Sequence, residues 1–220
     1  MVYNPNMSNP SSSDRRSFLT RFHAGAAAAI AFTSVALAQT KPAAPFVPAR
    51  HEKDDWMDVI GSKHRMVIDT TSTAGFSDGT LFANNFLLAN RNDYGLQNAD
   101  IGVIVVARHL STGYGFNDAM WAKYGAQLGD QPAPGAPAKE APKTNPSARS
   151  ITNLAGQGVH FAICAMATRR LAGQIAGTGG NVDAIVAELS ANTVANGHMV
   201  AAGIIAVNRA QERGFTAVKA

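Results

Sequence analysis

The chain has 220 residues, of which 46% are hydrophobic, enough apolar material for the core of one domain. Its formal net charge at pH 7 is only +4, and no basic stripe with interleaved aromatic residues accompanies it, so a nucleic-acid-binding protein is not expected. The single cysteine, Cys164, excludes an intramolecular disulfide.

The first 38 residues have the three zones of an export signal. A polar stretch precedes the pair Arg15 and Arg16, an alanine-rich apolar run covers 24–37, and residues 36–38 form an A-x-A cleavage site. The apolar run is shorter than the ~20 residues of a membrane-spanning helix, so no stable membrane anchor is expected. DRRSFLT resembles the twin-arginine consensus S/T-R-R-x-F-L-K, which implies export of the folded protein to the periplasm by the twin-arginine translocase.

Removal of these 38 residues leaves 182, with a net charge of +2, and we expect them to form one domain. Residues 39–60 begin with a Pro/Ala-rich linker or strap, and the domain itself covers 61–220. Within it, residues 129–147 contain five prolines and little apolar bulk, which predicts a surface insertion.

The first half of the domain contains two predicted strands, at 64–70 and 101–107, and the second of these is a continuous apolar run typical of a buried parallel strand. Residues 71–79 contain two glycines and are expected to form a polar loop. Helical spacing of apolar residues follows from Leu81, with Gly95 as the C-cap. A loop from Arg108 and a short helix from Asn117 or Asp118 come next.

The second half repeats this alternation of helices and strands. Helices are predicted at 147–156, 165–176 and 203–213, together with one capped by Asn181. Strands are predicted at 158–164, around His198 and at 215–219. Five strands that alternate with helices indicate an α/β fold with a mostly parallel sheet.

The pattern from GVHFAIC to the C-terminus resembles the DsrE/DsrF-like family of sulfur-relay proteins. The residues that fit this pattern in order are Gly158, Val159, Cys164, Gly203, Gln211, Gly214 and Phe215. The segments FANNFLLANRNDYG, RHLSTGYGFNDAMWAKYG and CAMATRR are similar to an exported subgroup of such proteins. The resemblance implies a three-layer fold, with helices on both sides of a five-stranded sheet, and a homo-oligomer.

Cys164 is the main candidate for chemistry, since it ends one strand and precedes a helix. Ligands of open parallel sheets bind at the carboxyl ends of the strands, and a helix N-terminus favours a thiolate. The resemblance implies that Cys164 is a persulfide-carrying sulfur acceptor that serves a thiol-bearing partner protein. The alternative is an inert, buried cysteine.

His109 follows the strand at 101–107 and is the second candidate catalytic residue, with simple loop hydrogen bonding as its alternative. Asp69 ends the first strand and could orient His109, contact a ligand or cap the turn that follows. The remaining candidates for the same crevice are Arg108, Ser111, Asn117 and His198. Asn117 could equally be only a helix cap, and His198 only a satisfied strand histidine.

Three functions remain open at this point: a sulfur carrier, a non-enzymatic assembly module and a metal or haem carrier. Trp121 and Tyr124 would serve packing or subunit contacts in the second case. His109, Cys164 and His198 could provide metal ligands in the third, but no ligand pair has a diagnostic spacing. No metal and no cofactor is therefore assigned.

Overall fold

A computed structural model describes residues 45–61, 63–130 and 140–220, and residues 46–220 form one compact unit. The predicted leader at 1–38 lies outside the described residues, as do the start of the linker and the middle of the Pro-rich insertion.

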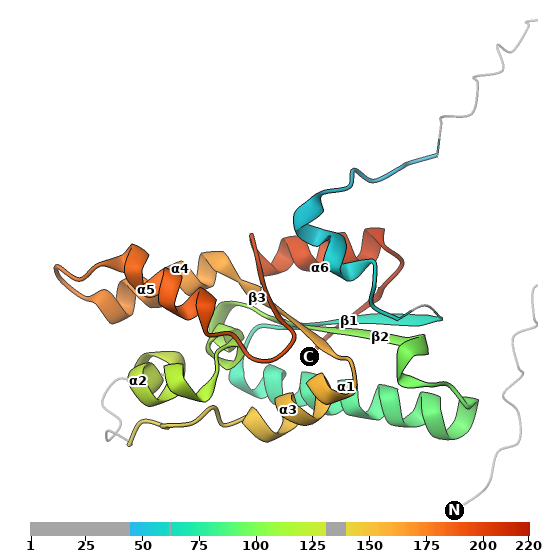
Figure 1. Ribbon diagram of the computed structural model, residues 1–220, viewed down its shortest axis with the longest axis horizontal. Helices are drawn as coiled ribbons and strands as arrows, with labels where there is room; N and C mark the ends of the chain where they lie inside the picture. The colour runs from blue at the N-terminus through green and yellow to red at the C-terminus, as the bar shows by residue number, and fades with distance from the viewer. Residues whose placement is uncertain (1–44, 62, 131–139) are drawn as a thin grey trace, which may run out of the picture. The chain divides into compact units, whose positions relative to one another are not determined.

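Five parallel strands form a single sheet in the order β4-β3-β2-β1-β5, which confirms the α/β fold (Figure 1). The strands are β1 His64–Thr70, β2 Ile101–Ala107, β3 His160–Cys164, β4 Gly197–Val200 and β5 Thr216–Lys219. The α-helices are α1 Thr73–Tyr94, α2 Asp118–Leu128, α3 Ala148–Gly156, α4 Ala165–Ala176, α5 Val182–Ala191 and α6 Gly203–Glu212. Short 3-10 helices occur at η1 Glu52–Met57, η2 Asn98–Asp100 and η3 His109–Gly115.

Helix α1 begins eight residues before the predicted helix, so the expectation of a polar loop at 71–79 was wrong. Ser72 is the N-cap and accepts a hydrogen bond from the backbone N–H of Gly75. A Cβ on Gly75 would lie 2.7 Å from the carbonyl oxygen of Ala220, and one on Gly79 would lie 2.7 Å from a methyl group of Thr70. These glycines therefore allow α1 to approach the sheet, rather than marking a turn.

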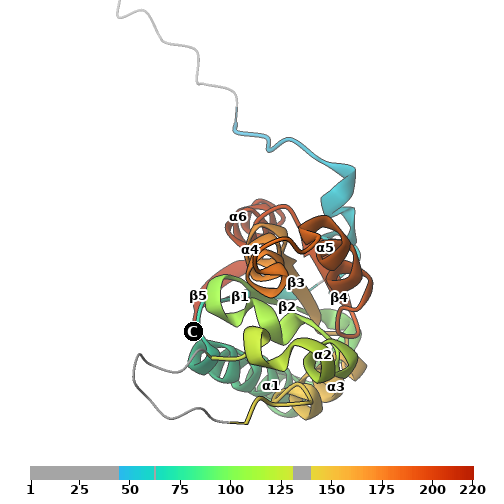
Figure 2. The same ribbon diagram turned by 90° about the vertical axis from the view of Figure 1, so that its left-hand side faces the viewer.

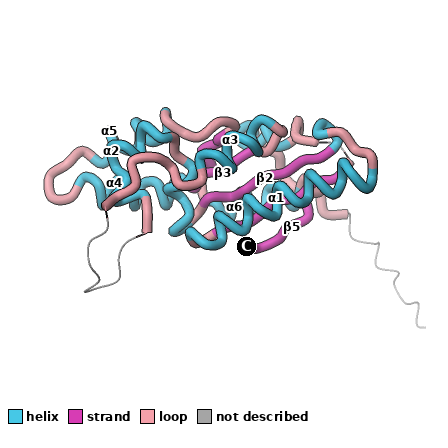
Figure 3. The backbone as a smooth tube through the Cα atoms, turned by 90° about the horizontal axis from the view of Figure 1, so that it is seen from below, coloured by secondary structure: helices cyan, strands magenta, loops and turns pink. Residues whose placement is uncertain are grey.

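The sheet lies between two helical layers (Figures 1 and 2). One layer consists of η1 and α6, and the other contains α1 and α3, which face the viewer in Figure 3. Alternation along β2 supplies both cores, since Val103 and Val105 point to the side of α1 whereas Ile104 and Val106 point to the side of α6. All four side chains are fully buried, as expected for a central parallel strand.

The segment at residues 50–61, which we call the strap, packs against α6 and the sheet. Met57 is fully buried and Ile60 is 3% exposed, within the core on the α6 side. Arg65 donates hydrogen bonds to the backbone carbonyls of Gly61 and Asp58. The strap is therefore part of the folded unit.

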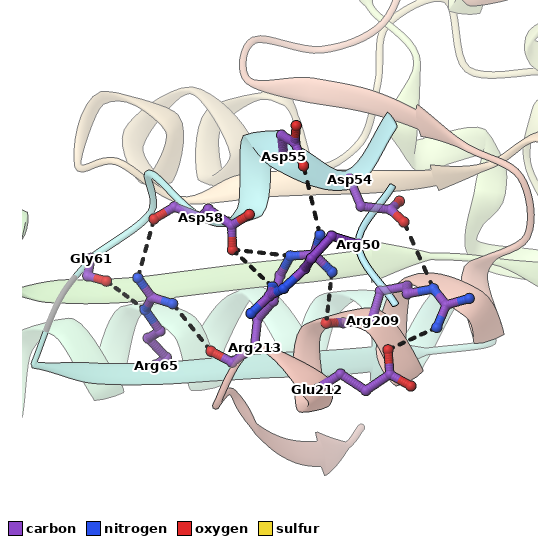
Figure 4. Close-up of polar contacts among 9 residues, drawn as sticks. All are labelled: Arg50, Asp54, Asp55, Asp58, Gly61, Arg65, Arg209, Glu212 and Arg213. Carbon is purple, nitrogen blue, oxygen red and sulfur yellow. Dashed lines mark hydrogen bonds and ion pairs between the residues drawn. The ribbon is translucent and has the colours of Figure 1, made fainter. Parts of the chain in front are cut away.

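Ion pairs join the strap to the C-terminal half of α6 (Figure 4). The side chain of Arg213 is 1% exposed, and its Nε donates to the Asp58 carboxylate at 3.1 Å. Asp58 also pairs with Arg50 at 3.2 Å, and Arg209 lies 3.8 Å from Asp54. Residues more than 150 positions apart in sequence thus fix the C-terminal end of α6 to the strap.

No helix within residues 45–61, 63–130 and 140–220 has both the length and the apolar character needed to span a membrane.

Candidate functional site

Three polar side chains share one face of the sheet at the carboxyl ends of β1, β2 and β3. The strands alternate, so Asp69 points to the same side as Val67, Arg108 to the same side as Val106, and Cys164 to the same side as Ala162. The apolar members of these pairs belong to the core on the α6 side. Asp69, Arg108 and Cys164 therefore lie at the end of the sheet near the start of α6.

Asp69 and Arg108 form a bidentate ion pair. The Nε and Nη2 atoms of Arg108 donate to the two carboxylate oxygens of Asp69, each at 2.7 Å. The pKa of Arg108 is raised, first by the hydrogen bond to Asp69 and further by the negative charges of Asp69 and Cys164. Asp69 thus positions Arg108. Within the described residues no hydrogen bond joins Asp69 to His109, and Ser72 rather than Asp69 caps the helix that follows.

Cys164 ends β3 and is the N-cap of α4. Its side chain is buried at 7% exposure, and its Sγ accepts a hydrogen bond from the backbone N–H of Ala167 at 3.4 Å. Thr168 holds the same turn, since its Oγ1 donates to the backbone carbonyl of Cys164 at 2.9 Å. The sulfur atom of Cys164 therefore lies at the N-terminus of α4, within the first turn of the helix.

Ser111 is fully buried in the loop that follows Arg108. Its Oγ accepts from the backbone N–H of Arg108 at 3.0 Å and from the Thr70 hydroxyl at 2.9 Å. The Ser111 hydroxyl thereby ties the start of η3 to the end of β1. Ser111 acts through the backbone of Arg108 and not through contact with Cys164.

His109 lies on the other side of this loop. It is exposed, its φ angle is +59°, and its backbone carbonyl accepts a hydrogen bond from Arg170. The His109 side chain lines a cavity of about 390 Å³ together with Arg170 and Gln174. Cys164 does not line this cavity, and no hydrogen bond within the described residues joins Cys164 to His109. In the described part of the chain, the two predicted catalytic residues therefore share neither a hydrogen bond nor this cavity.

Asn117 and His198 have contacts of their own that do not involve Cys164. Asn117 is the N-cap of α2 and accepts a hydrogen bond from the backbone N–H of Met120. His198 lies inside β4, two residues before Val200, which is the register partner of Cys164. Asn117 therefore has the helix-capping role that the sequence left open.

His198 belongs to an aromatic cluster that links the strap to β3 and β4. Trp56 stacks on His198 with ring centroids 3.9 Å apart, and His198 Nε2 lies 2.8 Å from His160 Nδ1. Burial lowers the pKa of both imidazoles, and the charge of His160 helps to lower that of His198 to about 4. Within the described residues no group of three metal-ligating side chains occurs, and His109, Cys164 and His198 are not gathered.

Four exposed apolar side chains lie in the first turns of η3, α4 and α6, the elements that begin directly after Arg108, Cys164 and Ala202. Their exposed fractions are 54% for Leu110, 71% for Met166, 57% for Ile204 and 40% for Ile205. We call these four residues the apolar rim.

A larger cavity of about 610 Å³ opens between the strap and the end of β4. Its floor includes Val200, the strand neighbour of Cys164, and Ile205 of the apolar rim. Arg50 and Lys53 of the strap and Arg209 of α6 also line it. The cavity therefore lies one strand away from the cysteine.

Sequence reasoning missed two elements of this arrangement. The Asp69–Arg108 pair could have been found from strand alternation, because both residues occupy positions of the α6-facing parity. The contact of Gly203 with Arg108 carries no such signal, since it joins residues 95 positions apart through a helix start.

Comparisons with known proteins add little to this description. No protein-family model matches the chain, and no curated protein matches it. Among solved structures, the chain is similar to the Protein of Unknown Function MTH1491 from Methanobacterium thermoautotrophicum, with a TM-score of 0.42 and 16% sequence identity over 72% of this chain and 100% of that one.

Proposed function

We propose that this protein is a periplasmic, DsrE-like sulfur carrier in which Cys164 accepts and passes on sulfane sulfur. The observation that carries the proposal is the position of Cys164, which caps α4 at the carboxyl edge of the sheet beside the Asp69–Arg108 pair. The resemblance of the C-terminal half to the DsrE/DsrF-like family supports the same assignment.

Loading begins with the thiolate of Cys164. The thiolate attacks the outer sulfur of a sulfane compound, a new S–S bond forms, and the old S–S bond breaks with its electron pair on the leaving group. With thiosulfate the leaving group is sulfite, and the product is the persulfide anion of Cys164. Charge and atoms balance without an oxidant.

Unloading requires a thiol-bearing partner. A partner thiolate attacks the outer sulfur of the Cys164 persulfide, and the Cys164 thiolate leaves. The apolar rim around Cys164 supports docking of such a partner or of a second copy of the chain, because large exposed apolar side chains that cluster at one place favour protein contacts.

Mass spectrometry of the purified, folded protein tests the carrier function. After exposure to polysulfide or thiosulfate, the native chain should gain the mass of one sulfur atom on Cys164, and dithiothreitol should remove it. A Cys164→Ser variant is the matched control and should stay unmodified. Absence of the adduct with both donors, although the unfolded chain accepts sulfur, would refute the proposal.

Export is a separate part of the proposal and rests on the sequence at residues 1–38. Replacement of Arg15 and Arg16 by lysine keeps the charge but removes the guanidinium pair that defines the twin-arginine signal. We expect the doubly substituted chain to accumulate inside the cell as precursor, whereas the native chain appears in the periplasm. Equal periplasmic amounts of the two chains would contradict export by this route.

A non-enzymatic assembly module is the second candidate, and the apolar rim is the observation that favours it. Trp121 does not contribute to such a surface, since it is fully buried. The Cys164→Ser variant distinguishes the two functions in cells. Full biological activity of that variant would favour assembly over sulfur transfer.

A further inference from the structure

Arg108 keeps hydrogen-bonding capacity beyond its ion pair. Asp69 occupies the Nε and Nη2 edge of the guanidinium, whereas Nη1 donates no hydrogen bond within the described residues. An arginine presents five N–H donors in a planar fork, so the free edge can bind an anionic oxygen. Arg108 directly follows Ala107, the register partner of Ile163, so Arg108 and Cys164 lie next to each other at the ends of β2 and β3.

The absence of a side chain at Gly203 leaves the space that the stem of Arg108 occupies. A Cβ at position 203 would meet the Cβ of Arg108 at 2.5 Å and its Cδ at 2.7 Å. These distances are far below van der Waals contact, and the first involves an atom that cannot swing away without backbone movement. The stem of Arg108 therefore packs directly on the first residue of α6.

The start of α6 adds positive potential to the same place. Ala202, its N-cap, provides no side-chain hydrogen bond, so the first N–H groups of the helix have no capping partner there. The contact between Gly203 and Arg108 brings this helix end to the aliphatic stem of Arg108.

We infer that Arg108, seated against Gly203, selects anionic sulfane-sulfur donors of the thiosulfate type for Cys164, and that Gly203 is the positioning residue for this selection. The inference rests on the proposed sulfur-carrier function. A donor anion that is bound by the free edge of Arg108 presents its outer sulfur to the thiolate, and the departing sulfite takes up the electron pair of the broken S–S bond beside a positive charge.

Alkylation of Cys164 measures this selectivity without any sulfur transfer. Iodoacetate is anionic and iodoacetamide is neutral, and both react by the same displacement of iodide by the thiolate. The rate constant for iodoacetate divided by the rate constant for iodoacetamide therefore reports the charge around Cys164. Loss of structure, by contrast, raises both rate constants. We expect this ratio of the rate constant for iodoacetate to that for iodoacetamide to fall about threefold or more in Arg108→Gln, which keeps a polar side chain but removes the charge.

Gly203→Ala should lower the ratio by a similar factor, because the new methyl group displaces Arg108. Gly173→Ala is the matched control, since Gly173 also lies in a helix and a Cβ there meets nothing within 4 Å. In an Arg108→Gln background, Gly203→Ala should change the ratio no further, because Gly203 acts through Arg108. Arg108→Lys, which retains a positive charge, should restore part of the ratio.

Three results separate the possible failures. If Arg108→Gln leaves the ratio unchanged, the proposed selection by Arg108 is overturned. If Arg108→Gln lowers the ratio but Gly203→Ala does not, the positioning role of Gly203 is overturned. If both variants lower the ratio but neither polysulfide nor thiosulfate leaves sulfur on native Cys164, the sulfur-carrier function fails while the two residue roles hold. Circular dichroism of each variant verifies that it is folded.

Discussion

Trp56 lies flat on His198, with ring planes only 5° apart, so an aromatic residue of the strap covers an imidazole of β4. The pKa of His198 falls from 6.5 to about 4, because burial disfavours its charged form and His160 lies beside it. The unfolded chain therefore binds a proton at His198 at a higher pH than the folded chain does.

This difference predicts a loss of stability on acidification. Stability contributed by neutral His198 is complete above pH 6.5 and is lost as the pH falls toward 4. Since the ring is only half-buried, we expect a loss on the order of 1–2 kcal/mol. Urea unfolding at about pH 7 and about pH 4.5 should show a smaller loss in His198→Gln than in the native chain. An equal loss in both would contradict this role.

Arg213→Ala should loosen the strap. The buried guanidinium bonds to Asp58, and its removal takes away this pair and much packing, so we expect a loss of about 2–3 kcal/mol in the free energy of unfolding. Limited proteolysis should also cut faster within residues 50–61. The control is Arg169→Ala, whose pair with Asp183 is 62% and 81% exposed, and which should change stability by less than about 0.5 kcal/mol.

Ser111→Ala should destabilise the loop that presents Arg108. Without the hydroxyl, the Thr70 side chain and the backbone N–H of Arg108 each lose a buried hydrogen bond. We expect a loss of about 1–3 kcal/mol, measured by urea unfolding. Ser150→Ala, at an exposed position of α3, should have almost no effect. A neutral result for Ser111→Ala would mean that the loop is held by other contacts.

Two helical glycines should respond to alanine with opposite signs. A Cβ on Gly125 would lie 1.9 Å from the carbonyl oxygen of Pro142, so Gly125→Ala must separate α2 from the end of the Pro-rich insertion. A Cβ on Gly156 meets nothing within 4 Å. Thermal unfolding should show a loss of about 2 kcal/mol or more for Gly125→Ala, and for Gly156→Ala a gain of up to about 1 kcal/mol from helix propensity.

The strands were the most predictable part of the fold. The observed bounds of β1 and β2 match the predicted ranges 64–70 and 101–107, because continuous apolar runs between polar turns have few alternatives to a buried strand. The third strand begins at His160, two residues later than predicted, and Gly158 before it has a φ of +89°, which interrupts the extended chain. The helices at 165–176 and after Asn181 also begin as predicted.

The start of α1 could not be predicted, because its glycines are explained by contacts with Thr70 and Ala220 that only the folded chain provides. The loop predicted after Arg108 is the 3-10 helix η3 over His109–Gly115.

The position of the candidate site in the fold could be predicted, but the hydrogen-bond partners of its residues could not. Topology alone brings Asp69, Arg108 and Cys164 to one edge of the sheet. His109 has a left-handed backbone conformation, and its carbonyl accepts a hydrogen bond from Arg170 of α4, neither of which the local sequence indicates. His198 pairs with His160 and Trp56, and these long-range contacts have no signature in the local sequence.

The strand order has a consequence for synthesis. β5 pairs with β1, so the first strand of the sheet has one unpaired edge until Thr216–Lys219 have been made. The strap residue Asp58 likewise lacks its ion pair with Arg213 until Arg213 has been made. A chain interrupted before α6 would therefore present an open strand edge and the apolar residues Met57 and Ile60 to its neighbours, the combination that promotes aggregation.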